Sequence, residues 1–156
     1  MADRSYTVTR DVRVAAPPSA VYAELVDFRR WRSWSPFEDL DPGMDRTYSG
    51  ATEGVGAVYA WSGSPKVGVG RMEITAADDG ARVVVEQRND KPLRSRSTST
   101  FTVAEADGGT LVTWSSTGTL SRLMRVVGVV VPMEKVLGPV FERGLERLRQ
   151  QVASGT

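Results

Sequence analysis

The stretch MEKVLGPVFERGLERLRQQV, residues 133–152, is the longest segment of the chain with helical periodicity. Apolar or small residues recur in it at steps of three and four, which places them on one face of an α-helix. Pro139 lies inside the run and cannot donate a backbone hydrogen bond, so we expect a kink or a restart of the helix there. The stretch predicts a long amphipathic C-terminal helix whose apolar face needs another layer to cover it. The face comprises Met133, Val136, Leu137, Val140, Phe141, Gly144, Leu145, Leu148 and Val152.

The segments before this helix alternate with the period of two that is typical of β-strands. A first strand over residues 6–14 ends before Pro17 and Pro18, and a short helix and an aromatic-rich turn follow as far as Pro36. The pairs Asp79-Gly80 and Asp107-Gly108 are typical of hairpin turns, so consecutive strands should form an antiparallel meander. We expect six further strands, over residues 45–50, 55–62, 67–77, 81–89, 94–105 and 109–120.

Together these elements predict a single domain over residues 1–156 with an α+β fold. A seven-stranded antiparallel curved sheet wraps around the long C-terminal helix, and two short helices follow the first strand. The sheet curls through its own twist. Side chains do not completely fill the interior of a curled sheet that grips one helix, so we expect an internal hydrophobic cavity.

Strand parity and the helical stripe select the side chains that face this cavity. They are aromatic and aliphatic, with some neutral polar groups and almost no charge. A plain core would explain the aromatic residues. However, polar groups without partners in a dry core cost about 1–3 kcal/mol each, so Gln87, Asn89 and the serines indicate water or a ligand inside. The expected pocket residues are Trp34, Tyr59, Trp61, Met72, Ile74, Val85, Gln87, Ser97, Phe101, Trp114, Met124, Val127, Leu137 and Phe141.

Composition excludes several kinds of chemistry. The chain has no histidine and no cysteine, so Ser-His-Asp triads, cysteine nucleophiles and thiolate zinc sites are impossible. We expect no catalytic residue, no metal and no cofactor. The acidic cluster Glu38, Asp39, Asp41 and Asp45 lies in a loop and is expected to be solvated.

Charge and hydropathy bear on partners and location. A net charge of +1 gives no steering toward nucleic acid, and no apolar run is long enough to form an integral membrane segment. The N-terminal residues lack the apolar region of a secretory signal, so we expect a cytoplasmic location. The oligomeric state stays open.

Four stretches carry a resemblance to a known family. They are residues 16–22 with Phe28, Trp31, Trp34, Ser35 and Pro36; residues 54–63 with 67–74; residues 109–114; and residues 133–139 with Phe141, Glu142, Arg143, Gly144, Leu145, Leu148 and Arg149. In this order they resemble the START / polyketide cyclase-dehydrase-like (SRPBCC) superfamily, which has the helix-grip fold. The resemblance implies a START-type domain and permits lipid carriers, cyclases and interaction modules alike.

Two segments admit more than one interpretation. Trp31 and Trp34 lie among arginines and would anchor the short helix to the sheet, form a lid over the cavity or stack on nucleic-acid bases, with the anchor favoured. The stretch 120–135 would be a buried lead-in to the long helix or a mobile gate. In the second case Met124, Val127 and Val131 line the entrance.

Three functional hypotheses follow. The first is binding or transport of a hydrophobic small molecule, such as a lipid or a polyketide-like or isoprenoid compound, in the cavity. The second is an enzyme of the cyclase or dehydratase type, in which Tyr59, a buried carboxylate or polarised water supplies acid-base help. The third is a protein-interaction module, which predicts a filled core and an exposed apolar patch.

Overall fold

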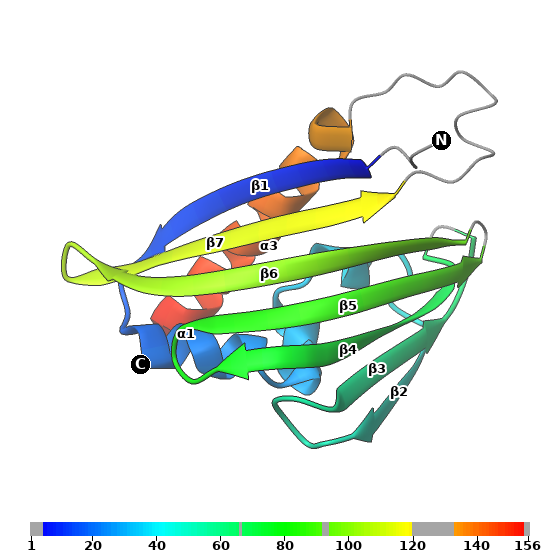
Figure 1. Ribbon diagram of the computed structural model, residues 1–156, viewed down its shortest axis with the longest axis horizontal. Coiled ribbons are helices and arrows are strands. Elements are labelled where there is room, and N and C mark those ends of the chain that lie inside the picture. Colours follow the sequence, from blue (N-terminus) through cyan, green and yellow to red (C-terminus); the bar gives the residue numbers. More distant parts are fainter. Residues whose placement is uncertain (1–4, 66, 92–93, 120–132, 155–156) are drawn as a thin grey trace.

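The computed structural model describes residues 5–65, 67–91, 94–119 and 133–154. Its elements follow the predicted order, with boundaries within about two residues of the expected ones (Figure 1). In chain order they are β1 (Ser5–Val14), α1 (Pro18–Leu25), the 3-10 helices η1 (Phe28–Ser33) and η2 (Pro36–Asp39), β2 (Asp45–Gly50), β3 (Ala57–Ser62), β4 (Val69–Asp78), β5 (Arg82–Lys91), β6 (Ser95–Ala106), β7 (Gly109–Thr119) and α3 (Met133–Ser154).

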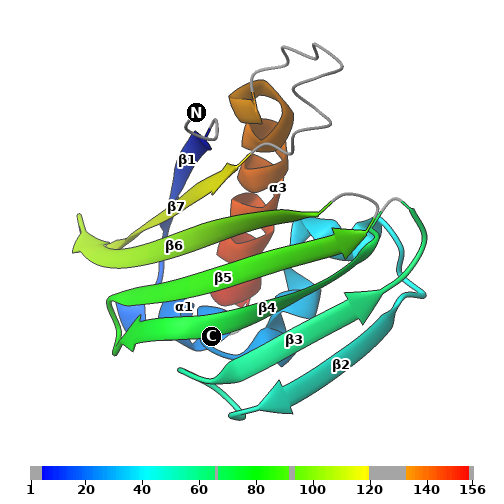
Figure 2. The same cartoon turned by 45° about the vertical axis from the view of Figure 1, so that its right-hand side comes forward.

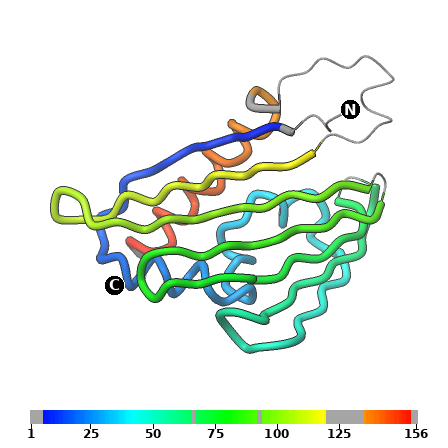
Figure 3. Tube along the Cα trace, in the orientation of Figure 1, coloured from blue at the N-terminus to red at the C-terminus, as the bar shows by residue number. Residues whose placement is uncertain are grey.

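The strands form one antiparallel sheet in the order β1-β7-β6-β5-β4-β3-β2. Figure 3 traces β1 beside β7, although they come from opposite ends of the sheet-forming sequence, and Ser5 pairs with Thr119. The sheet is curved, and α1 and α3 lie on the same side of it (Figures 1 and 2). The predicted α+β fold, with a curved seven-stranded sheet around a C-terminal helix, is confirmed.

The two predicted hairpin turns set the register of the central strands. Asp107 and Gly108 have φ values of 48° and 80° between the paired residues Ala106 and Gly109, as a two-residue type I′ turn requires. Gly80, with φ of 71°, turns the chain from β4 into β5. Because consecutive strands are joined this tightly, residues that share a face come into register across the sheet.

Helix α3 packs chiefly against β1 and runs without interruption through Pro139. The expected restart of the helix at this proline is therefore not found. Phe141, Leu145, Leu148 and Val152 are at most 5% exposed and form its buried stripe. A side chain at Gly144 would meet the Pro36 ring at 2.7 Å, so this glycine allows α3 to lie close to η2.

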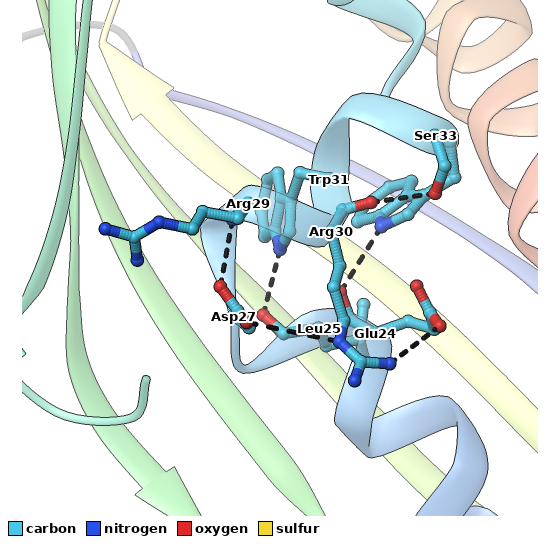
Figure 4. A network of polar contacts seen from close by, with 8 residues as sticks. Glu24, Leu25, Asp27, Arg29, Arg30, Trp31 and Ser33 are labelled. Atoms are coloured by element: carbon cyan, nitrogen blue, oxygen red, sulfur yellow. Dashed lines mark hydrogen bonds and ion pairs between the residues drawn. The ribbon is translucent and has the colours of Figure 1, made fainter. Parts of the chain in front are cut away.

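The segment after α1 is fixed by its tryptophans (Figure 4). The indole Nε1 of Trp31 donates to the Leu25 carbonyl at 2.9 Å, and that of Trp34 donates to the Glu24 carbonyl at 3.4 Å. Asp27 caps η1 by accepting from the Arg29 backbone N–H. Both indole rings are buried, which supports the anchor interpretation and leaves no ring face exposed for stacking on bases. Trp31 borders the cavity described below as part of its fixed wall.

Candidate functional site

A cavity of about 360 Å³ lies on the concave side of the sheet. Its lining comes from the inner faces of the strands, from η1, η2 and the residues around them, and from Leu137 and Phe141 of α3. The volume lies near the lower end of the range for pockets that hold drug-sized ligands. The walls are mainly apolar, with polar groups gathered at two places.

The structure brings most of the predicted pocket residues together at this cavity. The nine that line it are Tyr59, Trp61, Met72, Val85, Gln87, Ser97, Trp114, Leu137 and Phe141. Trp34, Ile74 and Phe101 do not line it; they are fully buried in the core next to it. Met124 and Val127 fall outside the described residues, as do residues 120–132 of the expected gate.

The apolar floor of the cavity is a continuous run of aromatic rings. Phe141 stacks on Trp114 with centroids 3.8 Å apart and an interplanar angle of 5°, which fastens α3 to β7. Trp114 in turn stacks on Phe101 at 5.0 Å, and Phe101 meets Trp31 edge-on at 5.5 Å. These contacts fill the space beneath the cavity, which is why Phe101 does not reach it.

The first polar place lies on β5, β6 and β7. The ladder pairs Gln87 with Ser97 and Asn89 with Ser95, and it pairs Ser99 with Ser116. All six side chains border the cavity. Two hydrogen bonds order the patch, from Gln87 Nε2 to Asn89 Oδ1 at 3.1 Å and from Asn89 Nδ2 to Ser95 Oγ at 2.9 Å. Strand parity therefore places a neutral polar patch in the apolar wall.

Ser116 has unused hydrogen-bonding capacity in this patch. It is 4% exposed, and among the described residues its hydroxyl has no hydrogen-bond partner. Ser99, by contrast, accepts from the Trp114 indole Nε1 at 3.2 Å. A buried hydroxyl without a partner costs about 1–3 kcal/mol, so Ser116 favours a cavity that holds water or a polar part of a ligand.

The second polar place is formed by Glu38, Tyr59 and Arg46. Glu38 is 7% exposed and lines the cavity from η2, and the Tyr59 hydroxyl donates to its Oε1 at 2.7 Å. Arg46 on β2 donates from Nε to Glu38 Oε2 at 2.9 Å, and its Nη2 lies 2.7 Å from the same oxygen. Arg46 itself does not border the cavity. Glu38, whose charge Arg46 neutralises from outside the cavity, thus faces the cavity beside Tyr59.

Glu38 corrects two sequence-based expectations. The acidic cluster was expected to be solvated, and Asp39 and Asp45 are indeed exposed, but Glu38 is buried. The wall was expected to hold almost no charge, yet Glu38 and the exposed Lys91 border it. The one-turn helix that begins at Pro36 causes the difference, because it turns Glu38 inward and leaves Asp39 outside. Glu38 lies in η2 and Arg46 in β2, so no single helical or strand period relates them and no sequence signal marked the pair.

The surroundings of the tyrosines keep their hydroxyls protonated. Burial, together with the hydrogen bond to Glu38, raises the pKa of Tyr59 far above its ordinary value. Burial also raises the pKa of Tyr6, whose ring lies against Gly118 at the cavity wall. Tyr59 therefore acts as a hydrogen-bond donor to Glu38 at any physiological pH.

The described residues form neither a metal-binding cluster nor a membrane-spanning helix. In that part of the chain no group of three or more acidic side chains is arranged to hold a metal ion. None of the helices there is both long and apolar enough to cross a bilayer.

Comparison with known protein families adds to this geometry. The family model described as "Polyketide cyclase / dehydrase and lipid transport" matches residues 5–153. The chain belongs to this family. A search of curated proteins finds no match.

Solved structures agree on the fold of this polyketide cyclase/dehydrase and lipid transport family member. Protein CV1439 from Chromobacterium violaceum is 16% identical, with a TM-score of 0.67, over 94% of this chain and 96% of its own. KanY protein is 22% identical, with a TM-score of 0.66, over 98% and 99%. Ara h 8.0201, a Bet v1 allergen, is 14% identical, with a TM-score of 0.65, over 97% and 99%. These likenesses establish a Bet v1-like fold, in agreement with the predicted helix-grip family.

Proposed function

We propose that this protein binds an apolar small molecule in the cavity between the sheet and α3, as a carrier or a sensor. The observation that carries the proposal is the cavity of about 360 Å³ with a mainly aromatic and aliphatic lining. Membership in a family that includes lipid transport supports it. The volume of the cavity favours one compact ligand over a large lipid with two acyl chains.

The proposed contacts divide between apolar walls and orienting polar groups. Trp61, Met72, Val85, Leu137 and Phe141 would bury the body of the ligand. Gln87, Ser97 and Ser116 would hydrogen-bond to its polar atoms, which removes the cost of leaving Ser116 without a partner. Tyr59 and Trp114 would contribute their ring faces to the apolar wall, and each also lies beside a polar side chain of the cavity, Glu38 and Ser99 respectively.

Native mass spectrometry of the protein purified from its own host tests the proposal. We expect a bound small molecule of constant mass that extraction into organic solvent releases. The matched sample is the Trp61→Arg variant, because a charged side chain in the wall should empty the cavity without touching the core around Trp34. A protein that carries nothing and takes up no apolar compound would contradict the proposal.

Glu38 and Tyr59 favour a second candidate, an enzyme of the cyclase or dehydratase type. For this chemistry the Tyr59 hydroxyl, which donates to Glu38 at 2.7 Å, would have to turn its hydrogen to a bound carbonyl compound while Glu38 accepts a proton. Cyclisation of a reactive ketone also gains much from a pocket that holds it folded. Turnover of a poly-β-ketone by the wild type that Tyr59→Phe and Glu38→Gln each abolish would support this candidate. Turnover that survives both substitutions would exclude this chemistry.

The interaction-module hypothesis has less support. It predicts a filled core, whereas the described residues line a cavity, and Trp31, which lies in the arginine-rich turn where a partner could bind, is buried.

A further inference from the structure

The buried charges beside the cavity need an explanation beyond stability. The side chains of Arg46 and Glu38 are 10% and 7% exposed. Removing two charges from water is costly, and a well-packed apolar pair of similar volume often serves a fold as well or better. The same wall accommodates Met44 and Tyr59 without such a cost. A buried ion pair whose carboxylate borders the cavity is therefore a candidate for recognising a ligand.

The hydrogen bonds of Glu38 and Tyr59 leave acceptor positions free for a ligand. A carboxylate has about four acceptor positions. Arg46 fills two of them at Oε2 and Tyr59 fills one at Oε1, so one acceptor position remains on Oε1. The Tyr59 hydroxyl uses its hydrogen in the bond to Glu38, so toward the cavity its oxygen too can accept. Both free positions belong to acceptors.

Arg46, by contrast, has no free N–H group that could donate to a ligand. Its Nε and Nη2 point to Glu38, its Nη1 donates to the carbonyls of Pro42 and Met44 at 3.3 and 3.2 Å, and its Nη2 also reaches Pro42 at 3.3 Å. These contacts occupy all five guanidinium N–H groups. An anionic ligand at Glu38 would therefore face the negative carboxylate, while Arg46 has no N–H left for it; among the described residues that line the cavity, the cationic one is Lys91, which lies on β5.

From this geometry, and on the basis of the proposed binding function, we infer that Glu38 and Tyr59 form a specificity site for a hydroxyl group on an uncharged apolar ligand. The ligand O–H donates to Glu38 Oε1 or to the Tyr59 oxygen while Arg46 holds the carboxylate in place from behind. A ligand that ends in a carboxylate is rejected there, because two negative charges face each other in a poorly solvated space. The site thus selects alcohols and phenols over fatty acids.

Three probes with one ring system test the inference on the intact wild-type protein: 2-naphthol, 2-methoxynaphthalene and 2-naphthoate. Isothermal titration calorimetry gives the affinities. We expect 2-naphthol to bind about tenfold or more tightly than 2-methoxynaphthalene, as a hydrogen bond to a charged acceptor implies, and 2-naphthoate to bind most weakly. The Glu38→Gln variant should bring the three affinities closer together. The matched control Glu73→Gln, on the solvent side of β4 and 43% exposed, should keep the wild-type ranking.

The outcomes separate this inference from the function on which it rests. Equal wild-type affinities for 2-naphthol and 2-methoxynaphthalene would overturn the hydroxyl site and leave the binding function standing. So would a folded Glu38→Gln variant, with unchanged near-UV circular dichroism, that keeps the wild-type ranking. If none of the three compounds binds the wild type, both the site and the proposed function fail. The wild-type comparison needs no variant, so a Glu38→Gln protein that does not fold cannot obscure the result.

Discussion

Replacing Arg46 by methionine tests whether the buried ion pair behaves as the structure implies. The substitution removes the cation and keeps most of the volume, so Glu38, which is 7% exposed in the wild type, keeps the Tyr59 hydroxyl as its partner among the described side chains. Breaking a buried pair by removing one member costs about 3–5 kcal/mol, because the remaining charge is uncompensated. This is a large share of the roughly 5–15 kcal/mol by which a domain is stable.

Urea unfolding followed by tryptophan fluorescence measures the effect, and thermal unfolding checks it. We expect Arg46→Met to lose about 3–5 kcal/mol in the free energy of unfolding and about 6–20 °C in Tm. Combining it with Glu38→Gln should recover much of the loss, since no charge is then left buried while the amide oxygen still accepts from Tyr59. Arg13→Met is the matched control: its pair with Asp107 is 67% and 81% exposed, so the loss should stay within about 1 kcal/mol.

The result that would refute this reasoning is a loss for Arg46→Met no larger than that for Arg13→Met. Water would then reach Glu38 freely, and the carboxylate would not be held in a poorly solvated wall. A double variant less stable than Arg46→Met alone would also contradict the account, because it would mean that the charge on Glu38 is stabilising without its partner.

Three further substitutions test other parts of the structure. The stability of the wild type relative to Tyr59→Phe should be constant below pH 10 and fall by up to about 1.4 kcal/mol per pH unit above it. The reason is that the unfolded phenol ionises near pH 10, whereas the pKa of Tyr59 is raised in the folded state. Urea unfolding from pH 8 to 11.5 measures this difference. Phe141→Ala removes a 3% exposed ring stacked on Trp114 and should cost about 3–5 kcal/mol, while Val136→Ala at a 46% exposed position should change stability by about 0.5 kcal/mol or less. Gly70→Ala places a Cβ 2.6 Å from the Trp61 ring and 2.7 Å from the Arg88 carbonyl oxygen, so it should cost about 1–3 kcal/mol and change the near-UV circular dichroism.

Each of these expectations has a contrary result. A difference between the wild type and Tyr59→Phe that does not change between pH 8 and 11.5 would mean that the Tyr59 pKa is ordinary. Equal losses for Phe141→Ala and Val136→Ala would mean that α3 is not fastened through the ring stack. Gly43→Ala serves as the control for Gly70→Ala, because its added Cβ would meet nothing nearer than 3.8 Å; equal effects of the two would contradict the close packing of Trp61.

The sequence was sufficient for the fold because its signals were local and consistent. The Asp-Gly pairs at 79–80 and 107–108 indicated two hairpins, and the meander gives the order from β2 to β7; the place of β1 beside β7 follows from no hairpin and was not predicted. Once the order is known, parity alone places Gln87, Ser97 and Trp114 on one inner wall. These steps require only nearest neighbours along the chain or across one pair of strands.

The parts of the site that the sequence did not predict depend on how far the aromatic cluster and the short helix η2 extend over the sheet. Parity correctly turned Phe101 and Ile74 inward, but it contains no information on how far the aromatic cluster beneath the cavity extends along the strands. Both residues are consequently core. Glu38 was missed for a similar reason, since its burial depends on a single turn at η2 and on a partner from β2. Contacts between non-periodic segments leave no pattern in the sequence.

The four tryptophans provide the most direct test of the central claim, that the cavity accepts an apolar guest. Trp31, Trp61 and Trp114 line the cavity and Trp34 does not, and each indole N–H donates to a different acceptor. Xenon enters apolar cavities whatever their natural ligand, so a 1H–15N spectrum of the indole groups under xenon pressure needs no knowledge of that ligand. We predict saturable shifts of the Trp31, Trp61 and Trp114 resonances and a distinctly smaller shift for Trp34. Four resonances that stay unchanged, or that all drift equally with pressure, would contradict the claim.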